Sequence, residues 1–419
     1  MRAKRNPEWC SADAAMARVG SGMTVACTSL SAEPIVLTSA LWRRARELDG
    51  ITLLTGMMVS GYPFLKDDMR GKVKLRTWFM PGTLLKGLSK KLDAEFLPLT
   101  WCQATKYMKS AAIDVALLQV SPADGDGNYS FGLSTAQSRA MVESAKTVIV
   151  QVNPAMPRTC GDSLIHESEI DVLVDAQQEL PLFPHREGDA ADRVVGELAA
   201  QFVGDGATIQ MGIGIMPGAF VDALIALGRK NLRVVSMVTD PIMRLIDAGC
   251  CIADNPKAIA VDVLGSPALY RWVENNPAIH MADSMAINTA ESLADRGEFV
   301  AVNSALEIDL WGQVNTERLD ALQAGGVGGS LDFMVGAQVV DGLSIIALRS
   351  TASRGQSRIV ERLQDPVVTI PRHLLQVVVT EFGVADLRNL SVRERAVALA
   401  RIAHPDYQER LLARAMVLD

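Results

Sequence analysis

Short runs of apolar, β-branched residues recur along the chain, separated by segments with helical periodicity. Several runs are largely apolar rather than alternating, such as Val115–Val120 and Thr147–Val152 with one glutamine each, which is typical of parallel strands buried on both faces. The predicted strands are Met23–Cys27, Val115–Val120, Thr147–Val152, Ile170–Val174, Thr208–Met211, Arg233–Met237, Ala258–Val263, Val300–Val302, Leu343–Ala347, Val367–Thr369 and Gln376–Thr380. The predicted helices include Ala190–Val203, Gly218–Leu227, Met243–Ala248, Ser391–Ile402 and Pro405–Met416. Strands alternating with helices favour an α/β fold with mainly parallel sheets.

The chain has 419 residues, which is too long for a single ordinary core and suggests two domains. The best linker is the segment ELPLFPHREGDA, residues 179–190, with two prolines, mixed charge and a glycine. We therefore expect an N-terminal domain over residues 1–187 and a C-terminal domain over residues 188–419.

Composition narrows the class of partner. The net charge is -7 and no long basic run is present, so nucleic acid is not the expected partner. No window approaches the roughly 18 unbroken apolar residues of a membrane span. The basic start lacks a long apolar core, so we expect no secretion signal and a cytoplasmic protein.

The six cysteines form no CxxC pair, and we expect reduced thiols and no metal site. Asp124 and Asp126 lie in a turn-rich loop that lacks the pattern of an EF-hand. GxSxG is absent, so an α/β-hydrolase nucleophile elbow is not supported.

A first glycine cluster follows the strand predicted over Thr208–Met211. The sequence QMGIGIMPGA places Gly212, Gly214 and Pro217 directly before or within the start of a helix. Glycines let a ligand approach the backbone, and free N–H groups at a helix start hold an anion or a polarised carbonyl oxygen. A tight strand-to-helix turn explains the same residues, so this motif alone leaves both interpretations open.

A second cluster, AGGVGGSLDF, spans residues 324–333 and carries Gly325, Gly326, Gly328 and Gly329. Glycine loses more conformational entropy on folding than any other residue, so this density favours a close ligand approach over a plain turn. The segment has neither the GK[ST] of a P-loop nor the GxGxxG of a dinucleotide site.

A third segment, LRSTASRGQSRIV at residues 348–360, concentrates Arg349, Arg354 and Arg358 among serines and threonines. Guanidinium groups in this setting can receive phosphate or carboxylate oxygens. A solvated loop is the alternative.

Taken together, these segments resemble the acetyl-CoA hydrolase/transferase family, which includes 4-hydroxybutyrate CoA-transferase and butyryl-CoA:acetate CoA-transferase. The similarity runs from about residue 115 to residue 415, and more weakly from residue 21. The matching stretches are DVALLQVSPADGDGNYSFG, VIVQVNPAMPRTCGDSLIH, IDVLV, DGATIQMGIGIMPGA, VAVNSALEIDLWGQVN, GGVGGSLDF, STASRGQSRIV, VVTEFGVADLRNLSVRERA and IAHPDYQERL.

The resemblance implies two tandem, open α/β domains of the CoA-transferase type, with the active site at their interface. It also implies a ping-pong transfer, in which a glutamate attacks an acyl-CoA and an enzyme–CoA thioester forms by way of an anhydride. Coenzyme A would be a substrate rather than a tightly bound cofactor, and a small carboxylic acid would accept it.

The resemblance also assigns roles to the glycine clusters. Gly212 and Gly214 would supply backbone donors to the thioester oxygen. The implied contacts to CoA or substrate are Pro217, Gly326, Val327, Gly328, Gly329, Arg349 and Arg358.

The chain departs from the family at the nucleophile. The family has a segment like HTEMFSDG, whereas residues 234–241 here read VVSMVTDP. With Met237 and Asp240 holding the register, the glutamate position falls on Ser236, and the preceding His and Thr become Val234 and Val235. A serine hydroxyl is a poor nucleophile without a neighbouring base, and the sequence places none beside it.

A second departure lies near the N-terminus. The family's GSGCGEP-like run is here TSLSAEP, residues 28–34, so Glu33 and Pro34 remain but the glycines are lost.

Three functions stay open. The chain is a CoA-transferase or thioester hydrolase with a replacement carboxylate, for which Glu33, Asp240, Glu307 and Glu381 are candidates. Alternatively, it catalyses another thioester reaction, such as acyl transfer, cyclisation or elimination, or it only binds a CoA thioester. We expect a thioester-processing enzyme of the CoA-transferase family that forms a homodimer or other homo-oligomer.

Overall fold

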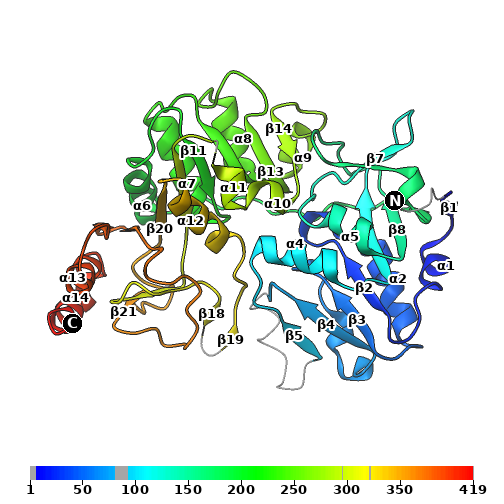
Figure 1. The fold of residues 1–419 in the computed structure, drawn as a ribbon, viewed down its shortest axis with the longest axis horizontal. Helices are drawn as coiled ribbons and strands as arrows, with labels where there is room; N and C mark the ends of the chain where they lie inside the picture. Colours follow the sequence, from blue (N-terminus) through cyan, green and yellow to red (C-terminus); the bar gives the residue numbers. More distant parts are fainter. Residues whose placement is uncertain (1–5, 81–92, 295, 320–321, 419) are drawn as a thin grey trace. The chain divides into compact units, whose positions relative to one another are not determined.

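The computed structural model describes residues 6–80, 93–294, 296–319 and 322–418 (Figure 1). The chain divides into two compact units. The first comprises residues 1–183 and 259–286, and the second comprises residues 184–258 and 287–419. The first break lies within the proline-containing segment 179–190, while residues 259–286 return to the first unit. The sequence domains 1–187 and 188–419 stay a prediction.

The first unit contains an eight-stranded sheet in which every neighbouring pair is parallel. Its strands, in spatial order, are β1 (Glu8–Trp9), β10 (Val172–Asp175), β8 (Thr147–Val152), β6 (Val115–Val120), β2 (Thr24–Cys27), β3 (Ile51–Leu54), β4 (Val73–Thr77) and β5 (Ala94–Phe96). Its main helices are α1 (Ala12–Met16), α2 (Ile35–Ala45), α4 (Trp101–Ser110) and α5 (Ser138–Ser144).

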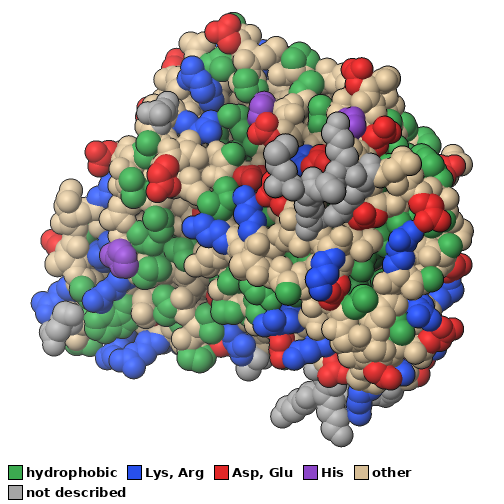
Figure 2. Space-filling model, turned by 45° about the vertical axis from the view of Figure 1, so that its right-hand side comes forward, with side chains coloured by type: hydrophobic (Ala, Val, Ile, Leu, Met, Phe, Trp, Pro, Cys, Tyr) green, Lys and Arg blue, Asp and Glu red, His purple; other side chains and the backbone are tan. Residues whose placement is uncertain are grey.

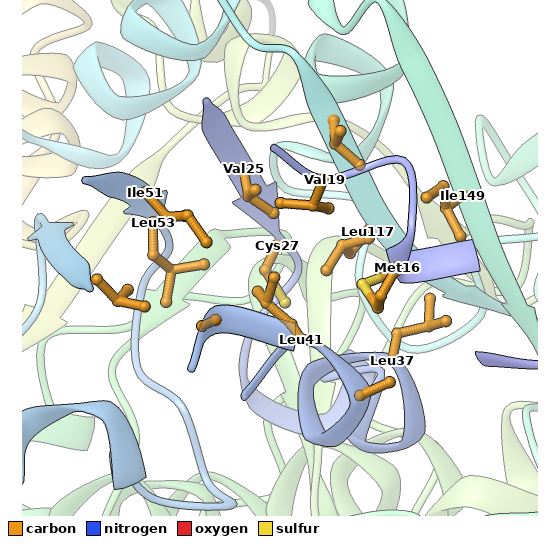
Figure 3. Close-up of a cluster of buried hydrophobic side chains, with 14 of the residues drawn as sticks. Met16, Val19, Val25, Cys27, Leu37, Leu41, Ile51, Leu53, Leu117 and Ile149 are labelled. Carbon is orange, nitrogen blue, oxygen red and sulfur yellow. The ribbon is translucent and has the colours of Figure 1, made fainter. Parts of the chain in front are cut away.

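Both faces of the central strands of this sheet are buried, which explains why strands such as β6 and β8 do not alternate between apolar and polar residues. Side chains alternate between the two faces of a strand. Val25 and Cys27 of β2 therefore pack in one cluster with Leu41 of α2, as Figure 3 shows. Ala26, between them, packs in the opposite cluster with Met108 of α4.

The second unit carries a second sheet. Five of its strands are consecutive parallel neighbours, and a sixth, β23, pairs antiparallel with the fifth, β22. Within this unit the strands run in the order β12 (Arg233–Thr239), β11 (Thr208–Met211), β15 (Phe299–Asn303), β20 (Leu343–Ala347), β22 (Val377–Thr380) and β23 (Gly383–Asp386). The longer helices are α6 (Ala190–Ala200), α7 (Ile215–Ala226), α8 (Asp240–Asp247), α12 (Ser330–Val339), α13 (Val392–Arg401) and α14 (Pro405–Ala415).

Local sequence signals fix several of these helices. Asp189 and Asp192 form a capping box at the start of α6, and Ser391 and Glu394 form another at the start of α13. Helices α6 and α7 approach closely because Gly196 has no side chain: a Cβ there would lie 2.5 Å from the backbone carbon of Ala219.

The predicted strand Val367–Thr369 is wrong. This segment makes only bridge-like contacts, in which the N–H groups of Thr369 and Ile370 donate to the Val314 carbonyl oxygen at 2.9 and 3.1 Å. A run of apolar residues is not a strand without a partner strand along its length. The sequence analysis also missed β3 and β4, which belong to the parallel sheet of the first unit.

No helix of the described residues has the length and apolar character needed to cross a membrane. On the face drawn in Figure 2, acidic and basic side chains are interspersed.

Candidate functional site

Apart from the candidate carboxylate Glu33, the predicted site residues all lie in the second unit, several of them where its parallel strands end. Gly212 directly follows β11, Asn303 ends β15, and Arg349 comes two residues after β20. Strands β12, β11, β15 and β20 are neighbours that run in one direction. In open α/β sheets, ligands bind beyond the carboxyl ends of the strands, so this edge is the candidate site.

The first glycine cluster forms the turn between β11 and α7. The Gly212 N–H donates to the Val302 carbonyl oxygen at 3.2 Å, which ties the turn to β15. Gly214 precedes the helix with a φ of 116°, a conformation that favours glycine, and no side chain caps the helix start. The helix α7 contains Pro217 near its start. No side chain at the N-cap accepts a hydrogen bond from its first backbone N–H groups.

The next glycine of this motif has a packing role. A Cβ on Gly218 would lie 2.1 Å from His185 Cε1, so the imidazole occupies the space of the missing side chain. Burial and the nearby Arg244 guanidinium lower the pKa of His185, although Asp222 and Asp240 act in the opposite direction.

Two buried side-chain amides, of Gln210 and Asn303, lie beside the turn, and the sequence analysis missed this pair. Asn303 Nδ2 donates to Gln210 Oε1 at 2.9 Å, and Gln210 Nε2 lies 3.4 Å from Asn303 Oδ1. Asn303 Oδ1 is also 3.9 Å from the position of a Cβ on Gly212. The sequence did contain a signal for this pair. The apolar strand FVAVN ends in an asparagine, and a buried side-chain amide needs a hydrogen-bond partner.

Ser236 lies in β12 and is only 3% exposed. Its Oγ donates to the Met211 carbonyl oxygen at 2.5 Å, at the end of the neighbouring strand. Among the described residues, no carboxylate, imidazole or amine forms a hydrogen bond with this hydroxyl. The geometry therefore provides no base that could activate Ser236 as a nucleophile.

The candidate replacement carboxylates of the second unit lie in three different environments. Both oxygens of Glu381 accept hydrogen bonds from Ser350, one from its N–H at 2.8 Å and one from its hydroxyl at 2.7 Å. Asp240 lies in the first turn of α8, where a negative charge is favourable. Glu307 is buried, and the Gln364 N–H approaches its Oε2 at 3.5 Å.

The fourth candidate, Glu33, lies in the first unit and is fully buried. Its carboxylate accepts hydrogen bonds from the Val59 N–H at 2.6 Å and from both the N–H and the hydroxyl of Ser60. Burial raises the pKa of Glu33, and these three donors oppose that rise.

The helix that follows Glu33 is capped by side chains of the same unit. The Ile35 N–H donates to Gln178 Oε1 at 2.8 Å, and the Val36 N–H donates to Gln151 Oε1 at 3.1 Å. The start of α2 therefore needs no external acceptor, although the glycines of the family pattern are lost.

The arginine-rich segment contains two different environments. Arg349 Nη1 donates to Asp189 Oδ1 at 2.7 Å and lies 3.3 Å from Asp192 Oδ1, which raises the pKa of the guanidinium. Among the described residues, the Arg358 side chain has a single long hydrogen bond, from Nη1 to the Ala305 carbonyl oxygen at 3.4 Å. Burial and the positive charge of Arg349 lower the pKa of Arg358.

The second glycine cluster leads into α12. Gly328 has a φ of 64°, and a Cβ on Gly329 would lie 2.9 Å from Asn288 Nδ2. The neighbouring Val327 is buried, and its carbonyl oxygen accepts a hydrogen bond from the Ser330 hydroxyl at 3.2 Å. Gly326, which precedes Val327, is half-buried.

Within the part of the chain that the structure describes, no group of three or more His, Cys, Asp or Glu side chains is arranged to hold a metal ion.

Comparison with known proteins decides the family. The pattern of the acetyl-CoA hydrolase/transferase N-terminal domain matches residues 2–184, and that of the C-terminal domain matches residues 265–415. The chain belongs to the acetyl-CoA hydrolase/transferase family. It is 34% identical to the 4-hydroxybutyrate coenzyme A transferase of Clostridium kluyveri, over 96% of this chain and 95% of that protein.

Solved structures agree with this assignment to the acetyl-CoA hydrolase/transferase family. RipA from Yersinia pestis is 29% identical with a TM-score of 0.90, covering 97% of both chains. The 4-hydroxybutyrate CoA-transferase from Porphyromonas gingivalis is 31% identical with a TM-score of 0.82, covering 96% of both chains. The predicted family, the α/β fold with mainly parallel sheets and the class of acyl-CoA-processing enzyme are thereby confirmed. The individual site residues stay predictions.

Proposed function

We propose that this protein moves CoA between an acyl thioester and a small carboxylate without a covalent glutamyl intermediate. The observation that supports the proposal is the environment of Ser236 in a chain of the CoA-transferase family. The side chain is buried, and its hydroxyl donates to the Met211 carbonyl oxygen. Coenzyme A is then a substrate, and no tightly bound cofactor takes part.

Direct attack by the acceptor gives a balanced route. The acceptor carboxylate attacks the thioester carbonyl and forms a new C–O bond, while the C–S bond breaks and CoA leaves as a thiolate. The product is a mixed anhydride held beside the thiolate. The thiolate then attacks the other carbonyl of the anhydride, which yields the new acyl-CoA and releases the original acyl group as a carboxylate.

The turn after β11 has the right groups to assist this route. A thioester carbonyl develops negative charge during each attack, and fixed N–H donors stabilise such an oxyanion. We assign this role to the backbone N–H groups that follow Gly212 in the turn to Gly214, at the uncapped start of α7, because the Gly212 N–H already donates to the Val302 carbonyl oxygen. Arg358 and the glycine loop of Gly326, Val327, Gly328 and Gly329 would contact the CoA moiety.

Three further properties of the protein belong to the same proposal. A small carboxylic acid is the expected acceptor, the chain forms a homo-oligomer such as a homodimer, and it works in the cytoplasm.

The test uses the full chain, a panel of acyl-CoAs and acetate as the acceptor. We expect new acyl-CoA, no covalent CoA adduct in intact-protein mass spectra, and intersecting double-reciprocal plots, because both substrates must be bound together. Parallel plots with a covalent adduct would refute the direct route. Free thiol without new acyl-CoA identifies a hydrolase, and binding without turnover identifies a non-catalytic protein.

A second experiment tests the register at position 236. Ser236→Glu should introduce a covalent CoA adduct if this position corresponds to the family's glutamate. Met237 is the matched control, since it is the next residue in β12 and is partly exposed. An adduct with Met237→Glu but not with Ser236→Glu would show that the register is shifted by one residue.

A further inference from the structure

A pocket of the second unit lies where two strands of its small sheet end together. β16 (Glu307–Asp309) and β21 (Ile359–Val360) are parallel, with Asp309 beside Val360. The cavity beyond them measures about 580 Å³, and its lining includes Asp309, Trp311, Gln313, Arg362, Asp365 and Arg372. This volume falls within the range of roughly 300–1,000 Å³ that is usual for small-molecule sites.

The two carboxylates of this lining already have partners. Asp365 is buried and accepts a hydrogen bond from Arg318 Nε at 2.6 Å. Asp309 accepts hydrogen bonds from the Trp311 N–H at 3.0 Å and from the Gln313 N–H and side-chain amide at 2.9 and 2.8 Å. Arg318 therefore offsets the charge of Asp365, whereas the donors to Asp309 are neutral groups.

The guanidinium groups of the lining are more available to a ligand than its two carboxylates are. Arg362 is exposed and forms no ion pair or hydrogen bond with any residue that the structure describes. The Arg372 guanidinium lies over the Trp311 ring, 5.9 Å from its centroid. Close by, Arg395 donates to the Arg372 carbonyl oxygen at 2.7 Å, and burial together with Arg372 lowers the pKa of Arg395. With Arg318 offsetting Asp365, the lining sets the two guanidinium groups of Arg362 and Arg372 against the single carboxylate of Asp309.

We propose that the pocket of Trp311, Arg362 and Arg372 binds a purine nucleoside phosphate, with the phosphates on the two guanidinium groups and the base against the indole. Two arginines suit phosphate oxygens because each guanidinium offers paired donors. A tryptophan side chain offers a flat apolar surface on which a base can stack. This inference stands on the pocket alone and does not depend on the transfer mechanism.

The binding test uses the full chain and three probes: adenosine 3′,5′-bisphosphate, ADP and inorganic phosphate. We expect calorimetry to show tighter binding of the two nucleotides than of phosphate. Arg362→Gln and Arg372→Gln should each weaken nucleotide binding about tenfold or more, because each removes a charged hydrogen-bond donor. Arg401→Gln is the matched control, since Arg401 is an exposed arginine at the end of α13 and does not line the pocket.

Fluorescence provides an independent readout that does not depend on an arginine variant. The chain has six tryptophans, and nucleotide binding should quench the wild-type signal but not that of Trp311→Phe. The proposal is overturned if neither nucleotide binds, if the two pocket variants bind as wild type does, or if Arg401→Gln weakens binding equally.

A competition experiment distinguishes two ligands that present the same nucleotide group, CoA and a free nucleotide. If CoA displaces the bisphosphate and needs Arg362 to do so, the pocket holds the nucleotide end of the CoA substrate. If CoA and the bisphosphate bind together, the pocket serves a free nucleotide. Both outcomes support a nucleotide site at Trp311.

Discussion

Ser236 and Met211 are joined by a hydrogen bond of 2.5 Å, from the serine hydroxyl to the backbone carbonyl at the end of the neighbouring strand. The hydroxyl is thereby used to hold β12 against β11 beside the glycine turn. If Ser236 corresponds to the family's nucleophile, as the sequence predicts, we expect it to act on the structure of the site rather than on the thioester.

Ser236→Ala tests this role directly. We expect kcat to change by no more than a few-fold and the free energy of unfolding to fall by about 1–3 kcal/mol, because a buried carbonyl loses its donor. Removing a true nucleophile lowers kcat by several powers of ten. Steady-state kinetics and urea unfolding of the same preparation distinguish the two, and a collapse of kcat with unchanged stability would identify Ser236 as a catalytic residue.

The role of the glycine turn is tested by Gly212→Ala. The nearest atom to the new Cβ is Asn303 Oδ1 at 3.9 Å, which is an ordinary contact, so the variant should fold with little change in stability. The methyl group would nevertheless stand where the thioester carbonyl approaches the backbone. We expect kcat/KM to fall about 10- to 100-fold, since a displacement of about 1 Å has effects of this size.

Gly125→Ala is the control for this substitution. A Cβ on Gly125 meets no atom within 4 Å, and the residue lies in a loop of the first unit. Equal activity losses in the two variants, or wild-type activity in Gly212→Ala, would remove the turn from the site.

The two predicted CoA-binding arginines should differ in their effects. Arg349 is held by Asp189 and Asp192, whereas the one hydrogen bond of the Arg358 side chain to any described residue is the long contact to the Ala305 carbonyl. We therefore expect Arg358→Gln to raise the KM for acyl-CoA about tenfold or more through loss of a charged donor. Arg349→Gln should mainly lower the melting temperature, and kinetics with thermal unfolding of both variants checks this. A larger rise in KM for Arg349→Gln would reverse the assignment.

The sequence predicted the sheets better than it predicted the site. Buried parallel strands such as β6 and β8 are largely apolar rather than alternating, so their existence follows from the pattern alone. The strand at Val367–Thr369 failed because pairing with a distant partner, not local composition, decides whether an apolar run becomes a strand.

The glycine clusters and the arginines were visible in the sequence, but their partners were not. Nothing near Asn303 in the chain indicates Gln210, 93 positions away, and nothing near Arg349 indicates Asp189. Such contacts depend on which strands and helices become neighbours. For the same reason, sequence alone could not show that the Ser236 hydroxyl has a backbone acceptor.

Asp262 provides a prediction about pH and stability. This carboxyl is 1% exposed, and among the described residues its Oδ2 has no hydrogen-bond partner. Burial raises its pKa to about 6, although a hydrogen bond with Ser134 opposes the rise. Between pH 4 and pH 6 the folded state therefore keeps a proton that the unfolded state has lost, so stability falls as the pH rises through this window.

Asp262→Asn should remove this dependence, because an amide does not titrate. A shift of about two pKa units corresponds to about 3 kcal/mol, so the variant should gain up to that much stability relative to wild type between pH 4 and pH 8. Urea unfolding at several pH values checks this, with Asp126→Asn as the control because Asp126 is exposed in a loop. If wild type and Asp262→Asn lose stability in parallel as the pH rises, Asp262 is ionised in the folded protein across the window.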